Sequence, residues 1–579
     1  MNPFTPAYLS APNSPLLSVL VFLPLIGAAL LMLFPRNETR TIRGFALVVS
    51  LIVLAVSLVL IVRYAPAAGS VFAFKQRIDW LPVVGAVYHL GVDGVALSLV
   101  VLTTLLTPIV ILAAFSQITD RVREYMISML VLEAGMLGAL CALDLVVFFI
   151  FWELMLVPMY FLIGVWGGDR RHYAAVKFVL FTVAGSVLML LAMLYLYFET
   201  GARSFDLAVL LGKDAIAPGK QWLPFLAFAL AFAIKVPMVP VHTWLPDAHT
   251  EAPTGGSVIL AGVLLKMGVY GFYRFAMPLM PDAARAAAPA LAALAVVGVV
   301  YGALLAMAQR DLKKLVAYSS VSHLGFVMLG LVALEPKAVT GAALQMINHG
   351  LSTGALFLIV GLLYERTHTR KLSDYGGLFK VTPAIAVVFL ITVLSSAALP
   401  GMNGFVGEFL ILSGSFASTG IPAIQAWTGV ATIGVVLGAA YLLIAYQRTM
   451  FGPVNEKVAS LRDLAPREIV YMAPLLVLFF AIGVFPRPVL SRLEPSVKVF
   501  TALVEKRSRI VAAATPGSTV RLGAPSVVPP RPTLQVQPIP TPNLAAPNLL
   551  QRVPRPTFAP AQPPSPITRP PSPKAEERR

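Results

Sequence analysis

Residues 223–245 read LPFLAFALAFAIKVPMVPVHTWL, an apolar stretch with a lysine, two prolines and a histidine in its interior. A helix of this length crosses the roughly 30 Å of hydrocarbon in a bilayer. Pro237 has no N–H to donate to the carbonyl of Ala233, and Pro240 repeats the defect three residues later. We therefore predict a membrane-spanning helix that is broken near its middle, directly after the ionisable Lys235.

The composition extends this prediction to most of the chain. The 579 residues are 58% hydrophobic and 12% charged, whereas soluble domains carry about 25% charged residues. The first arginine follows the first apolar run, so that run is not a cleavable signal. We predict an all-α membrane protein of about fourteen spans, near 16–35, 44–62, 92–115, 124–142, 145–166, 173–198, 223–245, 254–273, 287–308, 315–333, 338–363, 381–416 (interrupted), 424–446 and 468–486.

A second span, 381–416, also carries a break. Its centre reads SSAALPGMNGFVGEF, in which Pro400 leaves the carbonyl of Ser396 without a donor. Free carbonyls at membrane depth are tolerated only beside protein or water, so broken helices indicate hydrated cavities. Each break lies beside an ionisable group, Lys235 in one case and Glu408 in the other. This pairing favours a functional role over ordinary proline kinks.

Three further ionisable residues lie inside apolar runs: Glu153 in FFIFWELMLVPMY, Lys266 in SVILAGVLLKMGVYG and Glu133 in SMLVLEAGMLG. A charge at the bilayer centre costs at least about 2.5–3.5 kcal/mol. Static ion pairs are one explanation, but paired burial often gains nothing over apolar packing. A relay of groups that take up and release protons explains two lysines and three glutamates better. Lys177 lies near the end of its helix, where it can reach the interface, and ranks lower.

Histidines extend the pattern. Gln345, Asn348 and His349 share one helix face by their spacing. His323 follows serines in the preceding span, and His242 lies seven residues beyond the lysine of the first broken helix. A lone histidine is more often a packing residue, but three of them beside broken helices indicate a hydrated path. The secondary relay candidates are therefore His242, His323, His349, Glu133 and Lys177.

Several chemistries are absent from the sequence. The single cysteine, Cys141, can form neither an internal disulfide nor a thiolate metal site. We find no GxxxxGK[ST] phosphate loop, no dinucleotide glycine fingerprint and no Cys/His metal cluster. We therefore expect no cofactor and no metal in this chain, which can move charge but has no equipment for redox chemistry.

The distribution of lysine and arginine along the chain indicates its orientation in the membrane. Most basic residues fall in alternate loops, including GGDRR, QRDLKK and YERTHTRK. Placing these loops in the cytoplasm puts both termini on the outer side. On this interpretation the net charge of +17 reflects membrane topology and indicates no nucleic-acid partner.

The end of the chain differs from the rest. Residues 509–579 contain eighteen of the 47 prolines and little apolar content, so we expect an extended or disordered tail. It either straps a neighbouring protein or is uninvolved. We divide the chain into N-terminal spans 1–123, a core at 124–450, a last span with an exit segment at 451–510, and a Pro-rich tail at 511–579.

Four segments make the sequence recognisable: DLVVFFIFWELMLVPMYFLIGVWGG, KVPMVPVHTWLPDAHTEAPTGGSVILAGVLLKMGVYG, RDLKKLVAYSSVSHLGFVMLG and LPGMNGFVGEF. They closely resemble the antiporter-like membrane subunits of respiratory complex I, a family related to Mrp antiporter subunits. The resemblance covers residues 1 to about 500. It implies fourteen helices that contain two inverted five-helix repeats, at spans four to eight and nine to thirteen, with one broken helix each.

The resemblance also implies roles. Glu153 would pair with Lys235, Lys266 would lie on a central hydrated axis, and Glu408 would guard the outer half-channel. A proton would pass from Lys235 through Lys266 and the histidines to Glu408. Glutamate at position 408, where related branches generally have lysine, favours the M-type branch, as does the lack of a long lateral helix after the last span.

The implied activity is proton translocation by a membrane-arm subunit of an NADH:quinone oxidoreductase. FMN, iron–sulfur clusters and quinone would belong to other subunits, and L-like and N-like subunits would flank this chain in a bacterial inner membrane. Two alternatives remain: a subunit of an Mrp-type sodium/proton antiporter, and a non-conducting scaffold of the membrane arm. A solute transporter ranks third, because no span shows an organic-substrate pocket.

Overall fold

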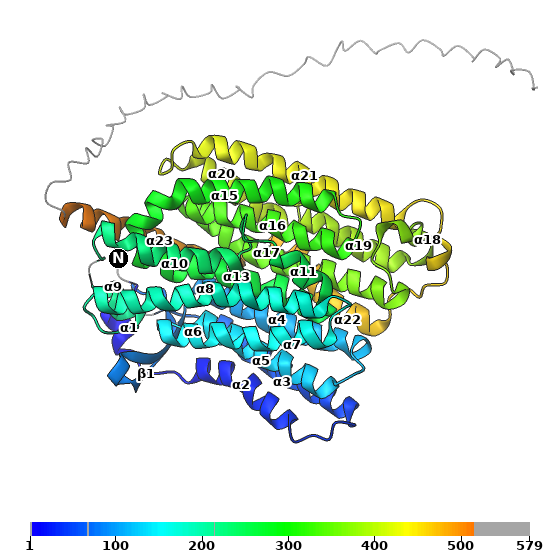
Figure 1. The fold of residues 1–579 in the computed structure, drawn as a ribbon, viewed down its shortest axis with the longest axis horizontal. Coiled ribbons are helices and arrows are strands. Elements are labelled where there is room, and N and C mark those ends of the chain that lie inside the picture. Colours follow the sequence, from blue (N-terminus) through cyan, green and yellow to red (C-terminus); the bar gives the residue numbers. More distant parts are fainter. Residues whose placement is uncertain (1–2, 67–68, 214, 515–579) are drawn as a thin grey trace, which may run out of the picture. The chain divides into compact units, whose positions relative to one another are not determined.

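The computed structural model describes residues 3–66, 69–213 and 215–514, which form a bundle of long helices (Figure 1). Within these residues, eleven helices are long and apolar enough to cross a membrane. They confirm a helical membrane protein, and their bounds are Thr39–Val62, Gly94–Gln117, Val122–Cys141, Leu145–Trp166, Arg171–Glu199, Thr254–Leu279, Pro281–Met307, Leu312–Val332, Pro336–Thr367, Ile424–Met450 and Pro466–Val484.

The first part of the chain contains a β-hairpin that the prediction of an all-α protein missed. Strands β1 (Ala73–Leu81) and β2 (Ala86–Val92) pair antiparallel around the turn η1 (Pro82–Val84). The alternation in this segment is too short and too polar to stand out against the long apolar runs around it. The helices on either side are α1 (Pro6–Ser10), α2 (Leu16–Leu31), α3 (Thr39–Val62), α4 (Gly94–Gln117) and α5 (Val122–Cys141).

The middle of the bundle is closed to the surroundings. The continuous helix Thr254–Leu279 and α17 (Pro336–Thr367) are wholly buried along their most apolar windows, and α16 (Leu312–Val332) nearly so. Two π-helical turns, η2 (Leu260–Leu264) and η3 (Phe272–Ala276), interrupt Thr254–Leu279 and separate α12 (Thr254–Ile259), α13 (Leu265–Gly271) and α14 (Met277–Leu279). The surrounding helices are α6 (Leu145–Leu154), α7 (Leu156–Trp166), α8 (Arg171–Glu199), α9 (Leu207–Gly212) and α15 (Pro281–Met307).

Both predicted helix breaks are present. The first separates α10 (Pro218–Lys235) from α11 (Trp244–Glu251), and the second separates α19 (Pro383–Ser396) from α20 (Asn403–Ala417). One detail of the prediction was wrong, because the carbonyl of Ala233 is not left free. It accepts a hydrogen bond from the Met238 N–H at 2.9 Å, while the Trp244 indole donates to the Ile234 carbonyl at 3.0 Å.

The last helices are α18 (Leu378–Val381), α21 (Ile424–Met450), α22 (Pro466–Val484) and α23 (Arg487–Ala514), with the 3-10 turns η4 (Leu372–Asp374) and η5 (Glu456–Val458). The 28-residue α23 was not expected, and it lies where the prediction had an exit segment without a long helix. Its buried residues Leu493, Val497, Phe500 and Val504 recur at helical spacing. Of the Pro-rich tail expected at 511–579, residues 511–514 belong to α23 instead, and the remainder lies outside the described residues.

A buried polar network fastens the hairpin to the bundle. We call the end of the bundle that carries β1 and β2 the hairpin end, and the other the α18 end. The Asp144 carboxylate, which begins α6, accepts hydrogen bonds from the N–H groups of Val146, Val147 and Val87. Burial, together with the nearby Asp206 charge, raises the pKa of Asp144 to about 7, although these hydrogen bonds act in the opposite direction.

We therefore expect a pH-dependent contribution of Asp144 to stability. Its pKa is higher in the folded protein than its usual 3.8, so the contribution is complete at acid pH and is lost as the pH rises to about 7. The Asp144→Asn variant lacks this titration. The melting temperature of the variant relative to that of the parent should therefore rise between about pH 5 and pH 7 and then level off. A difference that stays constant over that range contradicts the assignment.

Candidate functional site

Lys266 lies at the centre of the enclosed helices. Its Nζ donates to the carbonyl of Ala261 and to Nδ1 of His349, the latter at 2.6 Å. The side chain is 1% exposed, and within the described residues no carboxylate oxygen lies within 4.0 Å of Nζ. A buried ammonium without a counter-ion is costly, and the amine and the imidazole are close enough to share a proton.

A series of neighbouring ionisable side chains continues from His349. Its ring lies 5.6 Å, centroid to centroid, from the ring of His323 on α16. Nδ1 of His323 lies 3.1 Å from Oε1 of Glu408 on α20, and Nε2 lies 3.4 Å from the hydroxyl of Tyr441. The structure thus brings together Lys266, His349, His323 and Glu408, four of the residues selected from the sequence.

Amide side chains surround Glu408. Gln345 donates to its Oε1 at 3.2 Å, and Asn348 donates to the Asn403 carbonyl at 2.7 Å, on the first turn after the break. Gly407 permits this approach, because a Cβ there would lie 2.2 Å from the Gln345 side-chain oxygen. The polar stripe on α17 therefore faces the broken helix, as its spacing predicts.

The first break places Lys235 in a different environment. Its side chain is 1% exposed, and Nζ lies 5.2 Å from the ring of Trp152 and 5.5 Å from the ring of Phe178. Glu153, the next residue after Trp152, acts on Lys235 electrostatically. The two charges do not form an ion pair within 4.0 Å, and Oε1 of Glu153 is buried without a hydrogen-bond partner.

Close backbone packing joins the two regions without a side-chain contact. A Cβ on Gly268 would lie 2.6 Å from the Phe232 carbonyl oxygen, so the end of α10 packs directly on α13. Among the described residues no hydrogen bond links Lys235 to Lys266. Hydrogen bonds join Lys266 to His349 and His323 to Glu408. The two imidazole rings lie 5.6 Å apart, and within the described residues no hydrogen bond joins these rings or the two lysines.

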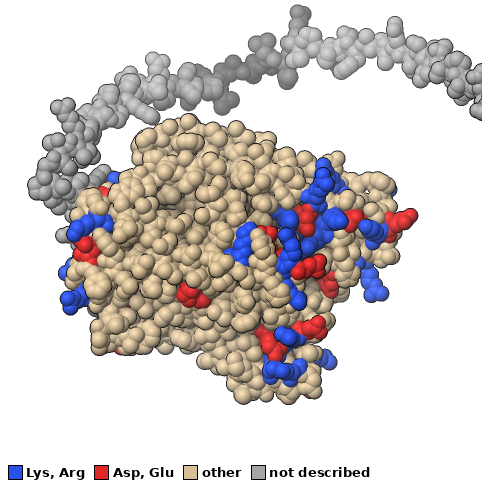
Figure 2. Space-filling view, in the orientation of Figure 1, with Lys and Arg blue, Asp and Glu red and all other residues tan. Residues whose placement is uncertain are grey.

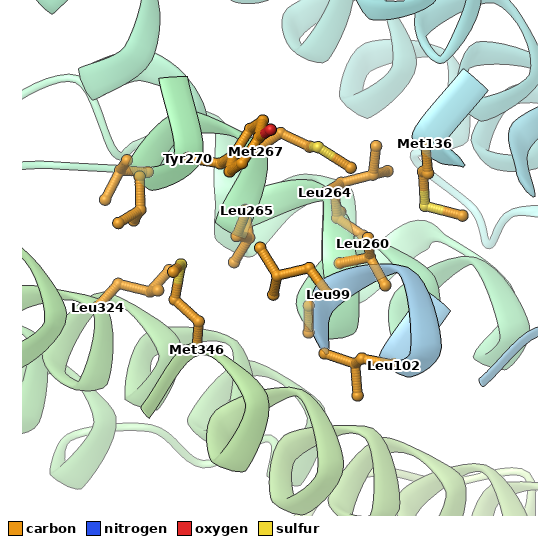
Figure 3. Close-up of a cluster of buried hydrophobic side chains, with 14 of the residues drawn as sticks. Leu99, Leu102, Met136, Leu260, Leu264, Leu265, Met267, Tyr270, Leu324 and Met346 are labelled. Carbon is orange, nitrogen blue, oxygen red and sulfur yellow. The ribbon is translucent and has the colours of Figure 1, made fainter. Parts of the chain in front are cut away.

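Apolar side chains insulate the central lysine. Figure 3 shows Leu264, Leu265 and Met267, from the same stretch of helix, together with side chains of the neighbouring helices. The residues from the neighbouring helices are Leu99, Leu102, Met136, Leu324 and Met346. The other faces of this helix therefore pack against apolar side chains of the protein.

The remaining candidates lie apart from this series. Lys177 forms an ion pair with Asp247 on α11 at 2.8 Å. His242 packs edge to face on Tyr301, with ring centroids 5.8 Å apart. Both carboxyl oxygens of Glu133 are buried without a partner. The structure therefore brings none of the three into direct contact with Lys266 or Glu408.

Sequence reasoning missed two residues near the centre. His249 on α11 is fully buried, stacks on Phe357 at 4.7 Å and lies within electrostatic range of Lys266 and Lys313. The amine of Lys313, which the sequence analysis assigned to a basic loop, donates to the Thr250 and Ala252 carbonyls. The sequence signal that could have identified His249 is the group of polar residues in WLPDAHTE, directly after the first helix break.

A cavity of about 330 Å³ lies beside Lys313, lined also by Glu251, Glu365, His368 and Arg370. Exposed His368 lies on its wall, so the cavity reaches the surface at the α18 end. Figure 2 shows that charged side chains gather at this end, while the face between the two ends is almost free of them. An uncharged band of this kind is what a lipid environment requires.

A buried ion pair at the hairpin end was also missed. Arg274 lies 2.6 Å from Asp93 and packs over the rings of Phe72, Tyr270 and Tyr273. Within the described ranges, no group of three or more His, Cys, Asp or Glu side chains is placed to hold a metal ion. What the site can do chemically is move protons between amine, imidazole and carboxylate groups.

The sequence of the chain is similar to those of known proteins. Residues 142–435 match the family described as NADH:quinone oxidoreductase/Mrp antiporter, TM. The chain is 44% identical over 498 residues to NADH-quinone oxidoreductase subunit M of Rhodobacter capsulatus, covering 83% of this chain and 95% of that protein. The resemblance to the M-type branch inferred from the sequence is therefore confirmed.

Solved structures agree. A chain of respiratory complex I from Thermus thermophilus with bound NADH superimposes with a TM-score of 0.77 at 33% identity, covering 84% of this chain and 99% of that one. A chain of the Mrp complex from Dietzia sp. DQ12-45-1b gives a TM-score of 0.69 at 24% identity, covering 86% of this chain and 55% of that one. The second likeness concerns the fold alone.

Two buried glutamates permit a comparison. We expect Glu408→Gln to lower the rate of electron-transfer-coupled turnover about tenfold or more, because Glu408 directly contacts His323 and Gln345 and adjoins a break. Glu133→Gln should have a smaller effect, because no hydrogen bond joins Glu133 to the series. Coupled NADH oxidation in membranes at matched content of the protein measures both. Equal rates in the two variants would contradict the importance of the break.

Proposed function

The chain belongs to the family of NADH:quinone oxidoreductase and Mrp antiporter membrane subunits, and we propose that it translocates protons as the M-type membrane-arm subunit of an NADH-quinone oxidoreductase. The observation that carries the proposal is the series of buried side chains Lys266, His349, His323 and Glu408, which ends at a helix break. Hydrogen bonds join the first two and the last two, and the two imidazole rings lie 5.6 Å apart. In this function the chain carries no redox centre. FMN, iron–sulfur clusters and quinone belong to other subunits.

The proposed proton step begins at Lys235. Separating Glu153 from Lys235 removes the charge that stabilises the ammonium, so the lysine releases its proton. The lack of an ion pair between them fits a contact that forms and breaks. Water at the break between α10 and α11 carries the proton to Lys266, because a helix interrupted at membrane depth is typical of a hydrated site.

From Lys266 the proton passes along this series. The amine donates to Nδ1 of His349. Nε2 of that ring is buried without a hydrogen-bond partner and the ring of His323 lies 5.6 Å away, so the transfer between the two rings requires a bridging water or a rotation of one ring. His323 then protonates Glu408, whose carboxylate lies 3.1 Å from it. Imidazole suits these steps because it accepts a proton at one nitrogen and releases one at the other.

The finer architecture is part of the proposal. We propose fourteen spans, in which the shorter apolar helix α2 and the two broken helices, α10–α11 and α19–α20, complete the eleven long ones. Two inverted repeats of five helices each contain one break. The outer side is the hairpin end, so that GGDRR, QRDLKK and YERTHTRK meet at the cytoplasmic α18 end of a bacterial inner membrane. L-like and N-like subunits flank the chain.

One alternative has a specific observation in its favour. The Mrp complex chain shares the fold at a TM-score of 0.69, so a subunit of a sodium/proton antiporter would use the same helices. Purification in mild detergent separates the two functions, since only the first predicts recovery with peripheral subunits that oxidise NADH. A non-conducting scaffold is the other alternative, and it predicts that charge-neutral variants pump normally.

We expect Lys235→Ala and Glu153→Ala to assemble and yet to pump protons at about a tenth of the parental rate or less, because each removes one partner of the pair that starts the relay. Proton pumping and NADH-driven quinone reduction are measured in sealed membrane vesicles, at matched content of the complex. A matched control is Lys380→Ala, which removes an exposed lysine in α18. Either variant pumping at the parental proton-to-electron ratio would contradict the relay.

A further inference from the structure

Asp144 joins two elements through one buried carboxylate. Its Oδ1 accepts hydrogen bonds from the N–H groups of Val146 at 2.8 Å and Val147 at 3.2 Å, which caps the start of α6. Its Oδ2 accepts the N–H of Val87 on strand β2 at 3.1 Å. The side chain is fully buried. One oxygen therefore serves the helix and the other serves the hairpin.

Backbone hydrogen bonds strengthen the same connection. The Leu143 N–H donates to the His89 carbonyl of β2 at 2.9 Å, and the Leu145 N–H donates to the Phe205 carbonyl at 3.0 Å. The Phe205 N–H in turn donates to the Gly85 carbonyl in the hairpin turn. The start of α6 is thus held by the hairpin directly and through the segment before α9.

The far end of α6 carries the surroundings of Lys235. The helix is ten residues long and ends at Leu154, where Met155 separates it from α7. Trp152, whose ring lies 5.2 Å from Nζ of Lys235, and Glu153 both occupy its last turn. Because a short helix moves as one rigid unit, the position of its first turn sets the position of both groups.

The hairpin itself is open to other contacts. Val83 at the turn is 95% exposed, and Trp80 and Val84 are each 48% exposed. These apolar side chains lie at the end of two paired strands, so a force applied to them is carried along the ladder to Val87 and His89. Trp152 and Glu153 both lie on α6, so a movement of this helix displaces the two residues together.

We propose that Asp144 is a positioning residue that keeps α6 in register with the hairpin β1–β2, so that a displacement of the hairpin moves Glu153 and Trp152 relative to Lys235. The inference rests on the proposed function, because it concerns the lysine at which the relay starts. Asp144 does not take part in proton transfer. It transmits the position of one end of the bundle to the buried charge.

Asp206 is the charged group that acts on Asp144. It is bonded in turn to His89 and Arg77 of the hairpin, and the Tyr8 hydroxyl of α1 lies 3.2 Å from Nε2 of His89. In Asp144→Asn the remaining carbonyl oxygen still caps α6, but the amide N–H₂ cannot accept from Val87. The variant therefore releases the hairpin and keeps the helix. Asp144→Ala releases both.

The experiment compares Asp144→Asn with a matched control variant in sealed membrane vesicles of the whole complex. Asp144→Asn should assemble at the parental level and yet pump protons about two- to tenfold more slowly, with an altered pH profile of pumping, because the coupling of the hairpin to α6 is weakened. Asp463→Asn is the matched control, since this carboxylate accepts the N–H groups of Ala384 and Ile385 at the start of α19. It should keep the parental pH profile.

Two results would overturn the inference. The first is Asp144→Asn pumping at the parental rate with the parental pH profile. The second is a loss of pumping that only follows a loss of complex and of melting temperature, to the same extent as in Asp463→Asn, because that pattern indicates a purely structural role. Lys235→Ala, measured in parallel, tests the proposed function separately. If it pumps normally the relay itself fails, whatever the Asp144 variants do.

Discussion

The amine of Lys266 is enclosed by helices that are buried inside the bundle, and its polar neighbours are a carbonyl and an imidazole. A charge in such a place is stable only while a neighbour shares it. The rest of the fold follows from this constraint. Apolar side chains close the other faces of the helix, as Figure 3 shows. The helices that carry His349 and His323 are buried so that their rings stay beside the lysine, and the two helix breaks lie where the ionisable series begins and ends.

The features that the sequence predicted are those that contradict their local surroundings. A lysine or glutamate in an apolar run costs free energy unless it has a function, so Lys235, Lys266 and Glu408 could be selected without a structure. Proline fixes the breaks by covalent geometry, and helical spacing placed His349 on the face that meets α20. These inferences need only residues that are close in the sequence, and for that reason they could be made without a structure.

Other features depend on contacts between distant segments, which no local pattern contains. Asp144 looked like the start of one apolar run, yet its carboxylate also holds a strand residue 57 positions away. The hairpin and the amphipathic α23 have weak signals beside long membrane helices. The ion pair of Glu153 and Lys235 was expected within contact distance, whereas the structure holds the two charges apart with Trp152 beside the lysine. Separation of this kind depends on the packing of α6, α8 and α10 together.

The central claim is that protons cross through Lys266. The most direct test measures NADH-driven proton pumping per complex in sealed vesicles that carry Lys266→Leu, which keeps the volume and removes the exchangeable proton. The account predicts that pumping falls about tenfold or more while the complex still assembles, because the series that leads to Glu408 loses the amine that donates its proton to His349. Pumping at the parental rate in that variant would contradict it.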